Sequence, residues 1–420
     1  MRILFVGSDI PSAMHTHAGA VSIVGREAMD AFLHKGHSVT FQAVLGSERR
    51  DDAARREGAD LESLERAGVA ALDPLVWSAG GAPSPTRPRR SDRFYPMTGF
   101  APAVAERVTH GRFDLVFSFW SPEALAATAD VSSAPVFTYY GNPDAKPGAA
   151  RLAHAELFDL DTSSPWGRLR LLRAQAENRS LARAHLRMMS HSTWAANVCK
   201  IDAEYYAAAG HPRAFYVQNM WADIGGKDWQ ALRDAHERDD APIIGSIGNI
   251  SSTGNRFGLL FLADELMPQL ERELGGRMID VLGIGDPGSL LRSKLTHPSV
   301  RMRGWVDDID QEILSSPVFL NVNNNCADFI VGHTRFLHAW SLGACVVAHE
   351  NSALAMPEIV HNENALLGGT GEEIAAHVVS AIEDADLRRR IGAGGRATFE
   401  RDFRATTVIE RVLARIAQDL

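Results

Sequence analysis

Short apolar runs alternate along the chain with longer segments in which apolar residues recur at helical spacing. The first run, residues 3–7, is continuously apolar like a buried parallel strand, and a polar loop follows it over residues 8–17. A helical pattern then ends at Gly36, and a second strand is predicted over residues 38–44. This order of strand, loop, helix and strand is typical of the first unit of a parallel sheet.

The same pattern predicts buried strands through the rest of the chain. In the first half they cover residues 114–119, 135–140, 186–190 and 214–218, and in the second half 242–247, 278–282, 300–303, 318–322, 345–348 and 365–367. Helical segments separate most of them, and no internal repeat is visible. We therefore predict an α/β fold of two Rossmann-like, doubly wound parallel-sheet domains that face an interdomain cleft.

A polar, acidic stretch over residues 219–240 contains Gly225 and Gly226 and is the predicted linker between the domains. We expect a first domain at residues 1–225 and a second at residues 240–399. The final segment, residues 400–420, has a helical pattern and is expected to pack back on the first domain. A chain of 420 residues with 45% hydrophobic and 23% charged residues agrees with two domains of ordinary size.

Residues 317–350 form the stretch around which the second half is organised. They read as a buried strand, a polar loop that begins with three asparagines, a helix over residues 334–342 and a second buried strand. Free N–H groups at a helix start attract anions, and doubly wound sheets bind ligands where a strand leads into such a helix. We therefore predict a site for a phosphorylated ligand, with Asn324 and Asn325 among its residues.

His333 precedes this helix and has two interpretations. It could donate a hydrogen bond to a phosphate or to a transferred sugar, or it could be a loop histidine near the helix cap. We favour binding, because the loop also contains Asn323 and Asp328 and no packing purpose for this polar cluster is evident from the sequence.

Two glycine-containing loops follow other predicted strands. Gly19 lies at the start of the first helix, so a ligand could approach the backbone there without meeting a Cβ. A G-x-G-x-x-G pattern occurs at Gly283, Gly285 and Gly288 with Pro287 inside it. A lone match of this kind is weak, and a strand-to-helix turn is favoured over a nicotinamide site.

Composition and charge exclude several classes of protein. The net charge of −9 gives no general attraction to nucleic acid, so we expect no nucleic-acid partner. The three cysteines are widely spaced, without C-x-x-C or H-x-x-x-H patterns, so neither a metal site nor a disulfide is expected. The chain passes from Arg2 directly into a strand and has no apolar run of membrane-spanning length. A cytoplasmic protein is therefore expected.

One helical segment, residues 166–188, is strongly basic. It contains Arg168, Arg170, Arg173, Arg179, Arg183 and Arg187 against Glu177 as its acidic residue. It could lie against an anionic membrane surface or hold a charged acceptor. A solvated helix paired with acidic neighbours is the equal alternative, so contact with the inner face of a membrane stays open.

The order of these motifs resembles the GT-B glycosyltransferases, and within them the retaining group 1 family called GT4. The resemblance is carried by Gly19, by Gly248 with Arg256, by Gly283 and Gly285, and by Gly304 with Trp305 and Val306. Residues 335–347, 357–360 and 363–367 carry it further. It covers nearly the whole chain and is stronger in the second half.

The resemblance implies a nucleoside-diphosphate sugar bound by the second domain and an acceptor bound by the first, with no metal and no other cofactor. Arg256 would take the place of the family lysine beside the diphosphate, with Gly19, Gly248 and Gly285 allowing close backbone approach. Trp305 and Val306 would flank the base. The acceptor would meet the loops of the first domain, for which the candidates are His17, Tyr139, Tyr140 and Asn142. Turn chemistry explains the last three nearly as well.

The chain departs from the family pattern at the donor site. Ile330 and His338 stand where relatives carry two glutamates, the second of which holds the ribose, and Asn249 stands where they carry an arginine. An imidazole forms hydrogen bonds but offers no bidentate carboxylate. Arg335 could supply the missing cation, because it lies three residues before His338 and shares its helix face.

Three functions therefore stay open. The first is a glycosyltransferase acting on a polysaccharide, lipid-linked or small-molecule acceptor, with Arg256, His333 and Arg335 as catalytic candidates. The second is a nucleotide-sugar epimerase on the same fold. The third is a binding module that has lost catalysis, as the replaced glutamates would allow.

Overall fold

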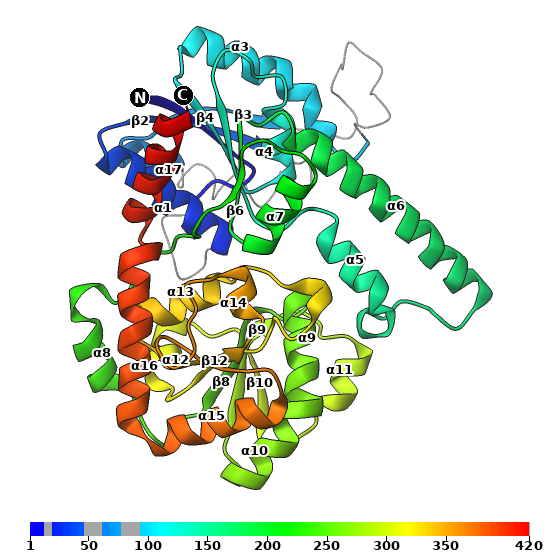
Figure 1. Cartoon of the computed structure of the whole chain (residues 1–420), viewed down its shortest axis with the longest axis vertical. Coiled ribbons are helices and arrows are strands. Elements are labelled where there is room, and N and C mark those ends of the chain that lie inside the picture. Colours follow the sequence, from blue (N-terminus) through cyan, green and yellow to red (C-terminus); the bar gives the residue numbers. More distant parts are fainter. Residues whose placement is uncertain (12–18, 46–60, 77–92, 420) are drawn as a thin grey trace. The chain divides into compact units, whose positions relative to one another are not determined.

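The computed structural model describes residues 1–11, 19–45, 61–76 and 93–419 (Figure 1). It comprises two compact units, each built on one parallel sheet, which confirms the predicted α/β fold class. The first unit contains Met1–Ala145, Arg179–Met220 and Ala405–Leu420, and the second contains Lys146–Asn178 and Trp221–Arg404.

The first unit has a parallel sheet with the strand order β3-β2-β1-β4-β5-β6-β7 among its described residues. The strands are β1 (Arg2–Gly7), β2 (Ser38–Leu45), β3 (Ala70–Val76), β4 (Leu115–Phe119), β5 (Val136–Tyr140), β6 (Trp194–Asn197) and β7 (Ala214–Tyr216). Its helices are α1 (Ala20–His34), η3 (Pro96–Phe100), α3 (Ala101–Gly111), α4 (Pro122–Ala127), α7 (Lys200–Ala208) and α17 (Ala405–Asp419). The rings of Phe5 and Phe137 stack on either side of Phe117, at centroid distances of 5.2 and 5.4 Å, and form part of its core.

The second unit has the strand order β10-β9-β8-β11-β12-β13. The strands are β8 (Ile243–Asn249), β9 (Ile279–Ile284), β10 (Val300–Gly304), β11 (Phe319–Asn321), β12 (Val346–His349) and β13 (Leu366–Gly368). The helices before β10 are α5 (Lys146–Ala153), η4 (Ala155–Phe158), η5 (Gly226–Asp228), α8 (Trp229–His236), α9 (Thr253–Phe261), η6 (Leu262–Leu266), α10 (Met267–Leu274) and α11 (Ser289–Lys294). Those after it are α12 (Ile309–Ser315), η7 (Ala327–Phe329), α13 (Thr334–Ser341), α14 (Ser352–Ala355), α15 (Gly371–Glu383), α16 (Ala385–Thr398) and η8 (Phe399–Phe403).

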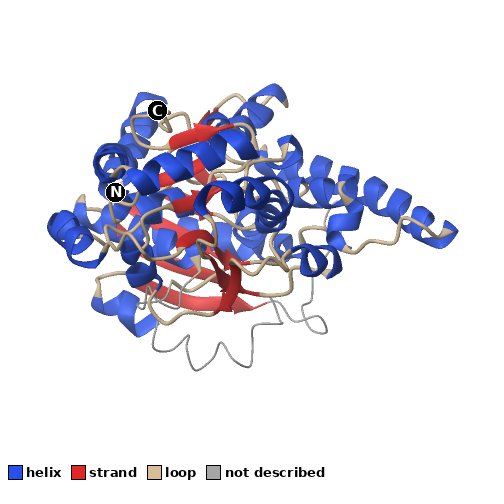
Figure 2. Cartoon of the chain, turned by 90° about the horizontal axis from the view of Figure 1, so that it is seen from below, coloured by secondary structure: helices blue, strands red, loops and turns tan. Residues whose placement is uncertain are grey.

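Helices flank the strands in both units (Figure 2), which explains the uninterrupted apolar runs of the central strands. In β12, for example, all four residues are buried. Among the described residues, no helix combines the length and the apolar character that crossing a membrane requires.

One predicted strand is absent and one observed strand was missed. Residues 186–190 are not a strand, because Leu186 to Met189 form the last turn of α6 (Pro165–Met189), and the strand β6 begins later at Trp194. A short apolar run does not distinguish a buried helix turn from a strand. The strand β3 was not predicted; its Pro74 is tolerated because β3 is an edge strand.

The division of the chain differs from the predicted boundaries in one segment. Residues 146–178, which lie inside the predicted first domain, belong to the second unit. The expected linker over residues 219–240 also carries η5 and α8. The terminal helix α17 lies in the first unit, where Lys35 of α1 pairs with Glu410 at 2.5 Å.

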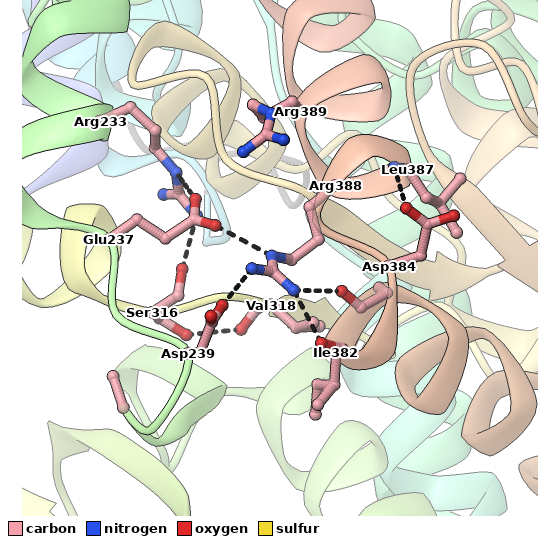
Figure 3. A network of polar contacts seen from close by, with 12 residues as sticks. Arg233, Glu237, Asp239, Ser316, Val318, Ile382, Asp384, Leu387, Arg388 and Arg389 are labelled. Carbon is pink, nitrogen blue, oxygen red and sulfur yellow. Dashed lines mark hydrogen bonds and ion pairs between the residues drawn. The ribbon is translucent and has the colours of Figure 1, made fainter.

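Two buried arginines fasten α8 to the rest of the second unit (Figure 3). Arg233, 5% exposed, donates to the carbonyl oxygens of Ile313 and Ser316 and pairs with Glu237 at 2.5 Å. Arg388 of α16, 4% exposed, reaches the same Glu237 at 2.9 Å. The carboxylate of Glu237, at the end of α8, therefore pairs with both guanidinium groups, so neither buried positive charge lacks a negative partner.

Candidate functional site

The strand order of the second unit reverses between β8 and β11. From β8 the chain builds β9 and β10 on one side, and from β11 it builds β12 and β13 on the other. In doubly wound sheets the loops at the carboxyl ends of the two strands at such a point diverge and form the ligand crevice. Here these loops are residues 250–252, which lead into α9, and residues 322–333, which lead towards α13.

The asparagines of the second loop hold its backbone in place. The amide of Asn324 bonds both the carbonyl and the N–H of Val331, at 2.9 and 3.0 Å. Asn325 donates to the carbonyl oxygen of Val322 at 2.7 Å, and Asn323 donates to Asn255 of α9 at 2.7 Å. The polar cluster thus has a packing purpose that was not evident from the sequence, and a donor contact by Asn324 or Asn325 stays a prediction.

His333 is the N-cap residue of α13 and lies against the start of α9. Its Nε2 is 3.1 Å from Oδ1 of Asn324, and a Cβ added to Gly254 would lie 3.6 Å from its Cε1. Burial, together with the charges of Arg335 and Lys146, holds the pKa of His333 well below its usual range. The ring is therefore neutral near pH 7; because Oδ1 of Asn324 accepts, Nε2 carries the proton and Nδ1 is an acceptor.

Arg335 places a positive charge at this point of the sheet. Within the part of the chain that the structure describes, its buried Nη1 atom has no hydrogen-bond partner. Its Nη2 atom approaches Gly248 at the end of β8, where an added Cβ would lie 3.7 Å away. Burial lowers the pKa of Arg335 to about 10, so the group stays cationic at neutral pH. A buried guanidinium nitrogen without a partner is costly unless a ligand supplies an acceptor.

Two further features favour an anion here. Lys146 of α5 donates to the carbonyl oxygen of Ile330, and its charge, like that of Arg335, lowers the pKa of His333. No side chain from the described ranges caps the start of α13. A helix start with free N–H groups beside two cations is a site for phosphate. Sequence reasoning missed Lys146, because 184 residues separate it from Ile330.

Asn321 adds a second unsatisfied group at the carboxyl end of β11. It is 1% exposed, and neither its Oδ1 nor its Nδ2 has a hydrogen-bond partner among the described residues. Sequence reasoning did not single it out, although its amide precedes the series of three asparagines by one residue.

Arg256, the predicted diphosphate cation, is held by other partners. Its Nη1 donates to the carbonyl oxygen of Leu157 at 2.8 Å and lies 3.4 Å from Oδ2 of Asp159, while Nη2 donates to Asp286. The guanidinium also covers the ring of Phe158. The structure therefore groups His333, Arg335 and Gly248 but directs Arg256 towards η4 and the loop after β9.

The other glycine loop brings Asn249 and Gly285 together. A Cβ on Gly285 would lie 2.9 Å from Oδ1 of Asn249, and this oxygen already accepts from the N–H of Ser251. Gly285 also has a φ of +112°, which an L side chain rarely adopts. Asn249 thus shapes the turn after β8, and its contact with a donor stays a prediction.

His338, three residues beyond Arg335, has partners within the protein. Its Nε2 is 2.5 Å from Oδ1 of Asp310 in α12, and its ring packs against Trp221 at a centroid distance of 5.5 Å. Trp305, 52% exposed, and Val306 follow the edge strand β10, two strands away from β8. An exposed indole at the carboxyl edge of a sheet can stack on a base.

In the first unit the predicted acceptor residues differ in exposure. Tyr139 and Tyr140 are 0% and 2% exposed; the hydroxyl of Tyr139 donates to Asn219 at 3.0 Å and that of Tyr140 to Asp144 at 2.6 Å. Asn142 is half-buried beyond the end of β5. Gly19 is exposed, and a Cβ added there would have no described atom within 4 Å. His17 lies outside the described residues.

Trp120 is a residue of the first unit that sequence reasoning missed. It follows β4, which lies next to β1 where the order of this sheet reverses, and its φ is +41°. A Cβ on Gly141 would overlap its Nε1 atom, so the indole occupies the space that this glycine leaves. Strained backbone of this kind is concentrated at functional sites.

The second unit also has a cavity of about 700 Å³ at the opposite edge of its sheet. It is lined by residues such as Pro242, Met278, Arg301 and Gln311, at or before the starts of the strands. Ligands of doubly wound sheets bind at the other edge, where the strands end. We therefore place the candidate site around Arg335 and not in this cavity.

The depressed pKa of His333 predicts how stability depends on pH. Unfolded histidine takes up a proton below about pH 6.5, whereas folded His333 stays neutral, so acidification favours unfolding. Between pH 7.5 and 5.5 we expect the wild type to lose up to about 1.4 kcal/mol more stability than His333→Gln. Urea unfolding at both pH values measures this difference; equal losses in the two proteins would contradict the assignment.

The second unit contains a segment that matches a known protein family. Residues 241–384, which run from the start of β8 to the end of α15, match the model of the family described as glycosyl transferases group 1. No match to the chain was found among curated protein sequences.

Several solved structures share the fold over the whole chain. HepE (Alr3699) of Anabaena, solved in complex with UDP, is 15% identical with a TM-score of 0.61 over 100% of both chains. A glycosyltransferase of Rickettsia africae is 12% identical with a TM-score of 0.56, covering 98% of this chain and 97% of that one. A putative UDP-N-acetylglucosamine 2-epimerase of Listeria monocytogenes is 11% identical with a TM-score of 0.50, covering 99% and 95%. At these identities the similarity establishes the fold alone.

Proposed function

We propose that the protein is a glycosyltransferase that moves a sugar from a nucleoside-diphosphate sugar to a polysaccharide, lipid-linked or small-molecule acceptor. The observation that carries the proposal is the buried Nη1 of Arg335, which has no partner among the described residues and lies at the switch point of a sheet within the segment that matches group 1 glycosyl transferases. The HepE complexes with UDP and with UDP-glucose support a donor of this class.

The positive groups at the site would stabilise the leaving diphosphate. Arg335 would pair with a phosphate oxygen, and the N–H groups at the start of α13 and the charge of Lys146 would add to the potential. Because these contacts grow as charge develops on the leaving group, they favour the transition state over bound donor. The resemblance to the retaining family adds that no metal contacts the diphosphate and that the anomeric configuration is kept.

We propose the remaining contacts to the sugar, base and ribose from the protonation of His333 and the exposure of Trp305. The acceptor atom Nδ1 of His333 would receive a hydrogen bond from a sugar hydroxyl, since Nε2 is used by Asn324. Trp305 and Val306 would flank the base. We place the ribose contact on the pair of His338 and Asp310, whose carboxylate would replace the glutamate of relatives.

A two-stage assay with the full chain tests this function. Thermal shift over UDP, GDP, CDP, ADP and dTDP first identifies the nucleotide, because a ligand of the native state raises its stability. The matching nucleotide sugars are then incubated with and without candidate acceptors, and nucleoside diphosphate is measured. Acceptor-dependent release supports transfer. Conversion of the donor sugar without acceptor would establish the epimerase alternative, and binding without any turnover would establish a binding module.

We also propose that α6 touches the inner face of an anionic membrane. Three large apolar side chains three residues apart, Trp166, Leu169 and Leu172, are 73%, 55% and 62% exposed. The exposed cations Arg168, Arg170 and Arg173 alternate with them. Apolar side chains beside basic ones fit the boundary between headgroups and acyl chains, and a lipid-linked acceptor would lie there.

Exchanging the apolar residues should weaken membrane binding. The triple variant Trp166→Ser, Leu169→Ser, Leu172→Ser is expected to bind vesicles containing phosphatidylglycerol at least about tenfold more weakly, since each large apolar side chain contributes about 1.5–3 kcal/mol when buried. Vesicle co-sedimentation measures this. Met302→Ser, which removes an exposed apolar side chain from β10, is the control. Equal binding by the triple variant and the control would refute the contact.

A further inference from the structure

Three potential metal ligands from distant parts of the sequence meet in the second unit. His154 follows α5, whereas Cys326 and Asp328 lie at the start of η7, in the loop that leads to α13. The Nε2 atom of His154 is 2.9 Å from Oδ2 of Asp328 and 3.4 Å from Sγ of Cys326. All three donor atoms lie within 4.8 Å of one another.

The orientation of His154 argues against a catalytic relay. A cysteine nucleophile activated through histidine needs the thiol on one ring nitrogen and the carboxylate on the other. Here both groups approach the same atom, Nε2, so this ring nitrogen points at the space between sulfur and oxygen. Three ligand atoms that converge in this way match the arrangement around a shared cation.

The spacing suits a tetrahedral ion. With bond lengths of about 2.0 Å to nitrogen and oxygen and about 2.3 Å to sulfur, tetrahedral ligands lie about 3.3–3.6 Å apart. The distance from His154 to Cys326 falls within this range, and the distance from His154 to Asp328 would need to lengthen by a few tenths of an ångström.

The surroundings offer contacts to a metal-bound sulfur. The backbone N–H groups of Asp328 and Phe329 are directed at the sulfur of Cys326 and would donate to it in the bound state. The ring of Phe257 meets the imidazole edge-on at a centroid distance of 4.9 Å and fixes its plane. The side chains of His154 and Asp328 are 39% and 60% exposed, so an ion can enter from solvent and keep a water ligand.

We propose that His154, Cys326 and Asp328 form a binding site for a thiophilic divalent cation, foremost Zn²⁺, that ties the end of α5 to the loop before α13. Imidazole, thiolate and carboxylate are ligands that zinc prefers, and a dication neutralises the two negative charges. No metal site was expected from the sequence, because its three cysteines are widely spaced and it has no C-x-x-C or H-x-x-x-H pattern. The cation holds the loop that carries Asn324 and His333 and takes no part in the transfer step proposed above.

Metal binding by the full chain, purified without an affinity tag and stripped with a chelator, tests the site. Zn²⁺ is titrated against a chromogenic competitor, and Co²⁺ is added separately to look for thiolate charge-transfer absorption in the near ultraviolet. One equivalent of Zn²⁺, bound at least a hundredfold more weakly by Cys326→Ser and by His154→Ala, supports the proposal. Cys199→Ser, which removes a buried thiol of the first unit, should bind like the wild type.

The outcomes separate this site from the proposed function. No stoichiometric binding by the wild type, or binding that Cys326→Ser and His154→Ala retain, would overturn the proposal. So would a cobalt spectrum without the thiolate band. Neither result depends on sugar transfer, and nucleotide binding by the metal-free chain would leave the donor site unaffected.

Discussion

Arg335→Met is expected to abolish most nucleoside-diphosphate binding and at the same time to stabilise the protein without ligand. The buried Nη1 of Arg335 has no hydrogen-bond partner among the described residues, so its removal takes away a buried polar atom that these residues leave unsatisfied. Replacing a buried charge by an apolar side chain of similar length is often neutral or stabilising, by about 1–4 kcal/mol. Hydrogen bonds to charged groups contribute about 1.5–3 kcal/mol, which corresponds to about 10–150-fold in Kd.

Two measurements test this prediction, because nucleotide affinity should fall whereas stability without ligand should not. Calorimetric titration with the nucleotide found by thermal shift should show the loss of affinity, and urea unfolding without ligand should show equal or higher stability than the wild type. Lower stability together with unchanged affinity would show that Arg335 serves the fold and would remove the donor site from this position.

Arg256→Met provides the comparison. Its guanidinium already donates to Leu157 and Asp286, so we expect this variant to lose stability and to change affinity less than Arg335→Met. An affinity loss in Arg256→Met larger than that in Arg335→Met would instead support the assignment that the sequence resemblance suggested.

Much of the fold could be predicted because buried parallel strands leave a strong apolar signal. The central strands β1, β4 and β12 are almost wholly buried, and their runs stand out. The failures lie where that signal is weaker. The edge strand β3 is only partly buried and contains a proline. The apolar end of α6 is too short to show whether its apolar residues recur at helix or strand spacing.

Only the part of the site that depends on local sequence patterns could be predicted. The rule that ligands of doubly wound sheets bind where a strand leads into a helix start pointed to the loop before α13, and thus to His333. Arg335 came from its position beside His338 on the same helix face. No local pattern indicates that residues 146–178 leave the first half of the chain and join the second unit. Lys146 and His154 lie in that segment, so their contacts with the loop arise from tertiary packing.

The asparagines of the loop before α13 were predicted to contact a ligand, but the structure gives them partners within the protein. Their density suggested ligand contacts, yet Asn323, Asn324 and Asn325 hydrogen-bond the protein itself. A polar loop that crosses the edge of a sheet must satisfy its own buried N–H and C=O groups, and side-chain amides do this well. Polar residues near the edge of the sheet therefore indicate a ligand only when they have unsatisfied atoms, as Arg335 of α13 and Asn321 of β11 do among the described residues.

Arg388→Met is expected to destabilise the protein by about 3–5 kcal/mol, whereas Arg389→Met should change stability by no more than about 0.5 kcal/mol. The two arginines are neighbours in α16, and Figure 3 shows the partners of Arg388. Arg388 donates to the carbonyl oxygens of Ala381 and Ile382 and pairs with Glu237, and its side chain is 3% exposed. Removing it leaves Glu237 with Arg233 alone and two carbonyl oxygens without this donor.

The side chain of Arg389, 59% exposed, pairs with Asp386 in water, where such pairs contribute little. Urea unfolding of both variants, followed by tryptophan fluorescence, measures the contrast. Should Arg388→Met fail to fold, Glu237→Gln keeps the shape of the partner, removes its charge and should destabilise in the same direction. Similar, small effects of all three substitutions would show that the buried network does not hold α8 to the second unit. The Nη1 atom of Arg335 is buried but has no partner in the described ranges. The contrast with Arg388 therefore also tests whether a missing partner, and not burial alone, identifies a binding residue in this protein.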